Sequence, residues 1–579
     1  KGSDAIYEVK DVISYTILES TVDSISLTTD KEVVTEGFPL TLSTQVITTG
    51  SPNLEYKFWV YKNGGWSILK NYSESSSFIW KPSKKGEYRL VVQARRKGSQ
   101  VVAEVSDIIS YKVIGRISYI DMNYSRTYEE ALVKQLNINP QTDIYDGSWG
   151  TAMLKDVDRY LNPENFLQFS NDQYNYNDVV KTGQIKVIPK DLHVRKEADI
   201  NSEIVDKIQR GETYRVVDKY GEWFKIQTSV TSGWVHSGYV YELYKSREPA
   251  LSDIKITTSV LNVRENPTTS SDIVDQVLEG QVYTALDQSN GWYKIKTSKT
   301  YGWVHGGYVT KVYSVTKGSV KNLSALEITT DVLNVRSQPS TSGTQLTQVK
   351  NGEIFIIQGE SNGWYKINSS GIVGWVHGGY TKMTNQAPQE MYQFLLLSGN
   401  SGLSSYELNN ILEGRGILNG EGQAFVDASI KHNINEIYLI SHAFLETGYG
   451  TSSLAKGILV DTVDGKSVTP RVVYNMYGIG AYDSNPIGGG SEYAYKAGWF
   501  TPSQAIIGGA KFISERYVNN PTYKQDTLYK MKWNPNNPTS HQYATDIGWA
   551  YKQTSSIKRL YDLCTDYALK FEIPKYLQN

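Results

Sequence analysis

Residues 261–295 read LNVRENPTTSSDIVDQVLEGQVYTALDQSNGWYKI, which decides the organisation of the chain. Closely similar stretches begin 69 residues earlier, at Leu192, and 72 residues later, at Leu333. Each is followed by a tryptophan within a GWVH sequence, so the similarity extends over most of each period. Self-similarity at a fixed period marks an array of repeated structural units. The middle of the chain is therefore predicted to hold three copies of one small domain.

Each copy has short stretches in which residues point alternately to two faces, as in Trp292-Tyr293-Lys294-Ile295, separated by Gly, Asn and Pro. This period of two with frequent turns predicts a small all-β barrel. The shared pattern LNVR…GWYKI…GWVHGGYV resembles the bacterial SH3 domains, which typically target proteins to the cell wall. Its repeated aromatic residues fit a barrel core better than a ligand platform.

Composition excludes several classes of protein. The 579 residues carry 59 Lys and Arg against 60 Asp and Glu, a net charge of -1, and a nucleic-acid partner usually requires a basic excess. No stretch of about 18 apolar residues is present, so no membrane span is expected. The single cysteine, Cys564, cannot form an internal disulfide. Because His236, His305 and His377 fall in separate repeats, we expect no metal and no other cofactor.

The regions on either side of the repeats differ from each other. The alternation of Tyr88, Leu90 and Val92 predicts strands, and residues before about 114 weakly resemble Ig-like domains. Residues 128–136 read YEEALVKQL, which predicts a short helix. The stretch YLNPENF at residues 160–166 resembles one that typically lies just ahead of the last domain in the enzyme family named below. That resemblance implies an arm belonging to the last domain, with the barrels inserted between the two. The expected domains are an Ig-like β-sandwich at 1–114, a helical arm at 115–180, SH3-type barrels at 181–248, 249–318 and 319–386, and a final domain at 387–579.

The final domain contains the sequence INEIYLISHAFLETGYGTSSLAKG at residues 434–457. Apolar residues recur there at helical spacing and predict a helix that begins after Asn433 and stops at Gly448. Glu446 falls in its last turn, on a largely apolar face. Taken alone, this pattern is better explained by a surface glutamate at a helix end.

Several separate motifs in this region indicate a role for that glutamate. ETGYGTSSLAKG, YNMYGIGAYD, KAGWFTPSQAIIGGAKFISERYV and SHQYATDIGWA resemble an endo-β-N-acetylglucosaminidase of glycoside hydrolase family 73, over nearly all of residues 387–579. Such enzymes are bacterial autolysins that cleave the glycan strands of peptidoglycan. The resemblance implies a mostly helical, lysozyme-like domain with a small β lobe at about 457–473. The predicted fold class is thus a multidomain α+β protein.

The resemblance also assigns catalytic residues. Glu446 matches the family's catalytic glutamate and would act as general acid. A second carboxylate would lie roughly 6.5–9.5 Å away for inversion or about 5 Å away for retention. Asp483 is ranked first for this role, although Asp461 and Asp464 stay open, as does attack by the substrate's own 2-acetamido group. His442, one helical turn before Glu446, is either a hydrogen-bonded strut or tunes the acid's charge.

The remaining site predictions concern substrate contacts. Some residues belong to motifs that match the family's cleft walls, and two tryptophans are candidates for stacking on sugar rings, although each aromatic could instead be core. The predicted substrate-binding residues are Tyr477, Gly478, Tyr482, Trp499, Trp533, Tyr543, Asp546 and Trp549.

Together these features predict a peptidoglycan hydrolase that cleaves after N-acetylglucosamine and is held on the wall by its SH3 repeats. We expect a secreted, cell-wall-associated protein whose signal peptide has been removed, because the sequence opens KGSDAIYEVK without one. The alternatives are a muramidase or lytic transglycosylase on the same fold, and a wall-binding protein whose enzyme-like domain is inactive.

Overall fold

The structure, a computed structural model, describes residue 13 and residues 20–578 apart from 31–32, 37–38, 63, 84–85, 115–116, 146, 171, 175, 247–250, 483–484 and 565–566. The chain divides into two compact units, Lys1–Arg116 and Ile117–Asn579, which we describe separately. In the part that is described, no helix is long and apolar enough to cross a membrane.

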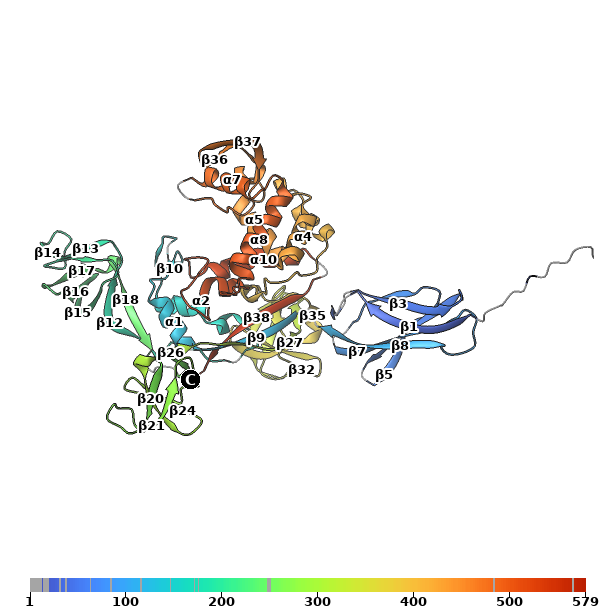
Figure 1. Cartoon of the computed structure of the whole chain (residues 1–579), viewed down its shortest axis with the longest axis horizontal. Coiled ribbons are helices and arrows are strands. Elements are labelled where there is room, and N and C mark those ends of the chain that lie inside the picture. Colours follow the sequence, from blue (N-terminus) through green and yellow to red (C-terminus); the bar gives the residue numbers. More distant parts are fainter. Residues whose placement is uncertain are drawn as a thin grey trace, which may run out of the picture. The chain divides into compact units, whose positions relative to one another are not determined.

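The first unit is a β-sandwich, as the sequence predicted (Figure 1). One sheet has the order β1-β3-β6 and the other β2-β8-β7-β4-β5. Alternate residues of both sheets, such as Leu40, Phe58 and Leu90, form a shared core. The strands are β1 (Thr21–Thr29), β2 (Val33–Thr35), β3 (Leu40–Thr49), β4 (Leu54–Lys62), β5 (Gly65–Ser73), β6 (Ser77–Trp80), β7 (Gly86–Arg96) and β8 (Val105–Ile114).

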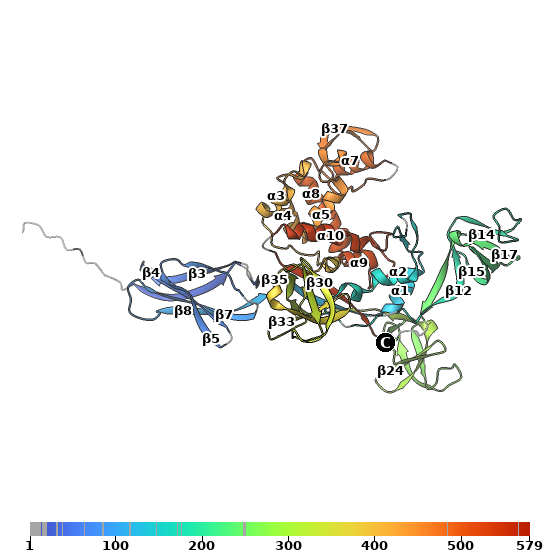
Figure 2. The ribbon, with the colours of Figure 1, turned by 180° about the vertical axis from the view of Figure 1, so that it is seen from behind.

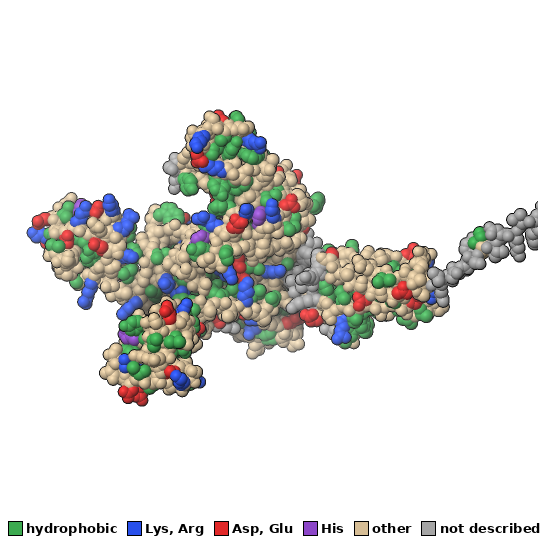
Figure 3. Space-filling model, in the orientation of Figure 1, with side chains coloured by type: hydrophobic (Ala, Val, Ile, Leu, Met, Phe, Trp, Pro, Cys, Tyr) green, Lys and Arg blue, Asp and Glu red, His purple; other side chains and the backbone are tan. Residues whose placement is uncertain are grey.

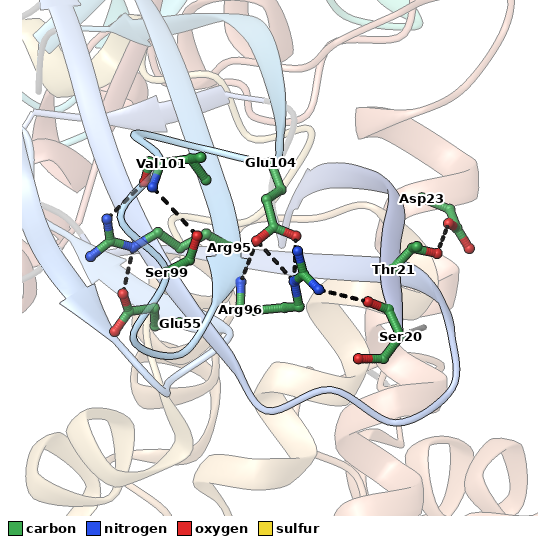
Figure 4. Close-up of polar contacts among 9 residues, drawn as sticks. All are labelled: Ser20, Thr21, Asp23, Glu55, Arg95, Arg96, Ser99, Val101 and Glu104. Atoms are coloured by element: carbon green, nitrogen blue, oxygen red, sulfur yellow. Dashed lines mark hydrogen bonds and ion pairs between the residues drawn. The ribbon is translucent and has the colours of Figure 1, made fainter. Parts of the chain in front are cut away.

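Two adjacent arginines of β7 fasten neighbouring segments of the sandwich (Figure 4). Arg95 pairs with Glu55, its cross-strand partner on β4, at 2.5 Å. Arg96 pairs with Glu104 at 3.1 Å and donates a hydrogen bond to the carbonyl of Ser20 at 3.0 Å. These contacts tie the β7–β8 loop and the start of β1 to the central strands.

Each of the three SH3 repeats has a core of its own. The second and third repeats consist of a three-stranded and a five-stranded sheet, and the first of a seven-stranded sheet with two edges, so the expected barrels are not closed. The glycine of each GWVH sequence explains part of the repeat pattern. A Cβ atom at Gly302 would lie 2.6 Å from Val263 Cγ1, so only glycine lets these strands approach.

The strands of the repeats follow one another in the same order. The first repeat contains β12 (Val179–Val187), β13 (Asp191–Arg195), β14 (Ile204–Gln209), β15 (Thr213–Tyr220), β16 (Trp223–Gln227), β17 (Ser232–His236) and β18 (Val240–Ser246). The second contains β19 (Asp253–Ile256), β20 (Val260–Arg264), β21 (Ile273–Leu278), β22 (Val282–Thr284), β23 (Asp287–Ser289), β24 (Trp292–Lys296), β25 (Tyr301–His305) and β26 (Val309–Val312). The third contains β28 (Ala325–Ile328), β29 (Val332–Arg336), β30 (Gln345–Lys350), β31 (Ile354–Ile356), β32 (Gly359–Ser361), β33 (Trp364–Ser369), β34 (Ile372–His377) and β35 (Thr381–Thr384).

The segment predicted as a helical arm begins with a strand, β9 (Ile117–Thr127). β9 pairs in parallel with β38 (Leu569–Leu577), near the end of the chain, and antiparallel with β27 (Val315–Leu323), which follows the second repeat. Both neighbours are distant in sequence, so the short-range pattern could not show that this segment is the centre of a sheet. The predicted helix then follows as α1 (Tyr128–Leu136), and after it come β10 (Gln141–Thr142), β11 (Gly150–Thr151), α2 (Leu154–Leu161) and a 3-10 turn at Pro163–Phe166.

The final domain is mostly helical, as expected (Figure 2). Its buried residues form one core with those of the arm, in which the rings of Tyr128 and Tyr576 lie 5.5 Å apart. A hairpin of two strands packs against α7 as a small β lobe. The elements are α3 (Ser405–Leu412), α4 (Gly422–His432), α5 (Glu436–Thr447), α6 (Ser453–Lys456), β36 (Ile458–Val463), β37 (Lys466–Val473), α7 (Pro486–Lys496), α8 (Pro502–Ile513), α9 (Leu528–Trp533) and α10 (Trp549–Asp562), with 3-10 turns at Gln389–Phe394 and Gly416–Leu418 and a π turn at Ser514–Val518.

Candidate active site

Helix α5 presents Glu446 in its last turn. The helix packs against α4 and α10 and is buried along most of its length, whereas the Glu446 side chain stays 35% exposed. The predicted stop at Gly448 is confirmed, since this residue has φ 55°. The predicted cap at Asn433 is wrong. Asn433 has φ 49° and ends α4, while Asn435 caps α5 by accepting a hydrogen bond from the Tyr438 amide.

Two neighbours fix the surroundings of the Glu446 carboxylate. Its Oε1 lies 3.5 Å from Nε2 of His442, one helical turn earlier. Its Oε2 would lie 3.1 Å from a Cβ atom at Gly478, which has φ 62°. A side chain at position 478 would therefore be strained and would crowd the carboxylate. The glycine allows the backbone after Tyr477 to pass close to the acid.

His442 links the acid to a second part of the domain. Its Nε2 shares a hydrogen bond of 3.1 Å with the hydroxyl of Tyr543, in the loop before α10. Burial, followed by the negative charge of Glu446, raises the pKa of Tyr543 far above its ordinary value. Tyr543 therefore keeps its proton at neutral pH. The row Tyr543–His442–Glu446 places a neutral hydroxyl and an imidazole behind the carboxylate.

A pocket of about 40 Å³ opens beside this row, between α5 and α10. Tyr543 and Trp549 form one side, with ring centroids 4.8 Å apart. The other lining residues were not predicted from the sequence, although they follow one another at steps of three or four residues on α5 and of four residues from Trp549 on α10, which was a usable signal. They are Tyr438, Ser441, Leu445, Gln553 and Ile557.

Both predicted stacking tryptophans lie in the core instead. Trp499 is 4% exposed and Trp533 is 1% exposed, so neither has a free ring face for a sugar. Trp499 packs against Tyr493, with ring centroids 5.4 Å apart. Tyr477 is buried as well and contacts His442 edge-on at 5.5 Å, so it supports the site from within. Tyr482 differs, since 71% of it is exposed.

Asp546 braces the loop that carries Tyr543 and Trp549. Its Oδ1 accepts a hydrogen bond from the Gly548 amide at 3.1 Å, and its Oδ2 pairs with Lys552 at 2.9 Å. It is buried and forms an isolated β-bridge with Gln141 of the arm. These contacts give Asp546 a structural role and leave its carboxylate fully engaged.

Three aspartates are the protein's candidates for the second catalytic group. Asp483, ranked first from the sequence, lies outside the described residues. Asp464 pairs with Lys496 at 2.6 Å, and this contact holds the pKa of Asp464 below its usual range. Asp461 is exposed on β36 and accepts a hydrogen bond from Thr462 at 3.1 Å. Among the described residues, no group of three or more His, Cys, Asp or Glu side chains could hold a metal.

The small β lobe adds an apolar surface. Figure 3 shows hydrophobic side chains gathered over the lobe formed by β36, β37 and α7. Leu459, Val472 and Ile487 are exposed there. An exposed apolar surface beside a site is typical of a binding surface.

Family models match three parts of the chain. One described as a bacterial SH3 domain matches residues 190–241, 259–310 and 331–382. One described as a mannosyl-glycoprotein endo-beta-N-acetylglucosaminidase, the glucosaminidase model, matches residues 422–562, which include Glu446. A third, the Y_Y_Y domain, matches residues 48–113 of the β-sandwich.

Proteins similar to parts of this chain include a glucosaminidase and autolysins. The beta-N-acetylglucosaminidase of Bacillus subtilis (strain 168) is 50% identical over 265 residues, covering 44% of this chain and 28% of the relative. A bifunctional autolysin of Staphylococcus epidermidis is 46% identical over 220 residues, covering 38% of this chain and 16% of the relative. A crystal structure of a major bifunctional autolysin shares 46% identity, with a TM-score of 0.29, over 33% of this chain and 76% of that chain.

This chain thus spans less than a third of the length of both curated relatives. The similarity is that of domains and not of whole proteins. Residues 422–562 form a domain of the glucosaminidase family, and the chain carries three bacterial SH3 domains ahead of it.

Proposed function

We propose that this chain is a peptidoglycan hydrolase that cleaves the β-1,4 bond following N-acetylglucosamine, with Glu446 as general acid. The observation that carries the proposal is the position of Glu446. It is a half-exposed carboxylate at the end of a buried helix, beside a pocket walled by Tyr543 and Trp549, within a glucosaminidase-family domain.

The geometry supports an acid role for Glu446. A general acid must present its proton to the glycosidic oxygen while it stays fixed relative to the sugar. His442 Nε2 lies 3.5 Å from Glu446 Oε1 on one side, and the Gly478 backbone passes Oε2 on the other. Both contacts restrict the carboxylate without closing it off from solvent. Glu446 would therefore protonate the leaving oxygen as the glycosidic bond breaks.

The identity of the second catalytic group is also a proposal. We rank Asp483 first, as the acidic residue of the YNMYGIGAYD motif. Asp464 is the poorest of the alternatives because its carboxylate is already paired with Lys496. Asp461, and attack by the substrate's 2-acetamido group, remain the other routes.

The SH3 repeats give the proposed enzyme its location. We propose that they hold the protein on the bacterial cell wall, outside the cell, so that the catalytic domain acts on nearby glycan strands. Bacterial SH3 domains ahead of a glucosaminidase-family domain support this arrangement. The proposal involves no nucleic acid and no cofactor.

The proposal is tested by two glutamates of one helix. Glu446→Gln keeps the shape of the side chain and removes its acidic proton, so hydrolysis of purified walls should fall by at least about 10²-fold. Glu436, at the start of α5, is the matched control. It is buried and accepts hydrogen bonds from the Ser401 and Leu403 amides.

Glu436→Gln should lower the free energy of unfolding by about 1–3 kcal/mol while the activity per folded molecule is kept. Glu446→Gln should lose activity, while its free energy of unfolding stays unchanged. If Glu446→Gln retained half of the wild-type activity, Glu446 would not be the general acid.

A further inference from the structure

A groove lies on the first and on the third SH3 repeat and is lined by equivalent residues in both. On the third repeat its cavity volume is about 450 Å³, and on the first it is about 200 Å³. In the third repeat the groove is lined by Leu333, Asn334, Arg336, Trp364, His377 and Tyr380. The equivalent residues of the first repeat are Leu192, His193, Arg195, Trp223, His236 and Tyr239.

The aromatic side of this groove has the same geometry in all three repeats. The tryptophan and histidine rings meet edge-on at 5.2, 5.0 and 5.0 Å, in chain order. The histidine and tyrosine rings lie 5.9, 5.7 and 5.6 Å apart. Each histidine Nδ1 accepts a hydrogen bond from a glycine amide two residues later, at 3.1–3.2 Å. The rings are therefore held in place before any ligand arrives.

Packing in the core of the repeat does not account for all of these residues. Tyr380 is 52% exposed, and its counterparts Tyr239 and Tyr308 are similarly exposed, so burial does not explain why each repeat has a tyrosine there. Other exposed positions differ freely between the repeats, as Ile200 and Thr341 of the two grooves show. A retained, exposed aromatic ring at a groove is typical of a binding site.

The charge of the groove differs between the repeats. In the third repeat the only charged lining residue is Arg336, whose Nη1 donates to the Gly343 carbonyl at 2.8 Å. No ion pair joins Arg336 to any carboxylate among the described residues. The second repeat has the same residues, with Arg264 held by the Ser271 carbonyl at 2.6 Å.

In the first repeat, one acidic residue lines the groove and a second lies beside it. Asp191 lines its groove at the position of Val332, and Glu222 replaces Gly363. The Glu222 carboxylate lies 3.2 Å from Nε2 of His236. Asp191 is paired with Lys207 at 3.4 Å, whereas no lysine or arginine pairs with Glu222 among the described residues. An anionic ligand that suits the second and third repeats would therefore meet the additional carboxylate of Glu222 in the first.

We infer that the groove of the third repeat, and the same set of residues in the second, bind a carboxylate of the peptide part of peptidoglycan, and that the groove of the first repeat does not. The inference rests on the proposed function in taking the wall as the target. Within that polymer the peptides carry carboxylates, whereas the glycan strand is neutral. Arg264 and Arg336 supply fixed guanidinium groups for an anion. Trp364 is buried, so it offers no open ring face to a sugar.

The test gives the second and third repeats an acid at the position that Asp191 occupies in the first. Val260 and Val332 are half-exposed, so replacing them should not unfold the repeats. In the full chain carrying Glu446→Gln, the double change Val260→Asp and Val332→Asp should weaken cosedimentation with purified walls about 10-fold, because it places a like charge beside each ligand. The matched double change to Asn should stay within about two-fold of the parent.

Competition then identifies the part of the wall that is bound. Soluble peptides released from walls by an amidase should displace the parent chain, and neutral oligosaccharides of N-acetylglucosamine should not. Glycan strands freed by the amidase are not used as the control, because the cut leaves a lactyl carboxylate on each muramic acid. Equal binding by the Asp and Asn variants, or displacement by the neutral oligosaccharides alone, would overturn the inference. The release of reducing ends from soluble strands by the wild-type chain is measured separately, so that failure of the proposed activity and failure of the groove assignment are distinguished.

Discussion

Lys532 is a single buried residue that supports the loop carrying Tyr543. Its side chain is buried, with only 2% of the residue exposed, and its Nζ donates hydrogen bonds of 3.0 Å to the carbonyls of Ala544 and Thr545. These carbonyls directly follow Tyr543, the partner of His442. Burial lowers the pKa of Lys532 to about 8, partly opposed by the charge of Asp546. The loop is thus held by an amine that loses its proton more readily than a free lysine does.

This residue predicts a specific dependence of stability on pH. An unfolded lysine has a pKa of about 10.4, so between about pH 8 and pH 10 the unfolded chain binds the additional proton. The free energy of unfolding of the wild type should therefore rise across this range by about 1–3 kcal/mol relative to Lys532→Met. Denaturant unfolding of both proteins at intervals of pH measures it. A difference that stays constant, or that shrinks with rising pH, would show that the buried amine is not perturbed in this direction.

At the scale of single elements, the sequence predicted where the helices lie better than it predicted what surrounds their side chains. The spacing of apolar residues located α5, and its stop at Gly448 could be predicted because glycine is the residue most often found at a left-handed helix end. It misplaced the start, since Asn433 and Asn435 are equally good caps by residue type. Only the packing of α4 assigns Asn433 to the end of that helix.

The same limit explains the aromatic residues of the site. Residue type alone does not distinguish a tryptophan on a cleft wall from one in a core, because both are large and apolar. Trp549 lines the pocket beside Glu446, whereas Trp499 is covered by Tyr493 and α8. The pocket itself depends on how α5 meets α10, which is a tertiary contact. Motif resemblance nevertheless led to Glu446, Gly478 and Tyr543, which the structure brings close together.

At the scale of the whole molecule, the catalytic domain is assembled from two distant parts of the chain. β38 lies beside β9, and the Ser118 hydroxyl reaches the Leu569 carbonyl, 451 residues away in sequence. Gln135 of α1 donates a hydrogen bond to the carbonyl of Trp533 at 2.9 Å. Such pairings leave no trace in short-range patterns. The SH3 repeats are therefore inserted within one folded unit and do not simply precede it.

This assembly predicts how truncated proteins behave. A fragment of residues 387–579 would expose the edge of β38 and the face of Tyr576 that packs on Tyr128. Its melting temperature should be at least about 10 °C below that of a fragment of residues 117–579, since several kcal/mol of burial is lost. Thermal unfolding followed by circular dichroism compares the two. Equal melting temperatures would mean that the arm does not contribute to the stability of the catalytic core.

The most direct test of the account identifies the sugar left at the new reducing end. Purified peptidoglycan is digested with the wild-type chain and, in parallel, with Glu446→Gln; the products are then reduced with borohydride and analysed by mass spectrometry. If Glu446 protonates the oxygen that follows N-acetylglucosamine, the wild-type digest should contain glucosaminitol ends, and the Glu446→Gln digest should contain almost none. Muramitol ends would show a muramidase, and anhydromuramic ends a transglycosylase. Either result, or no new ends from the wild type, would contradict the proposed function.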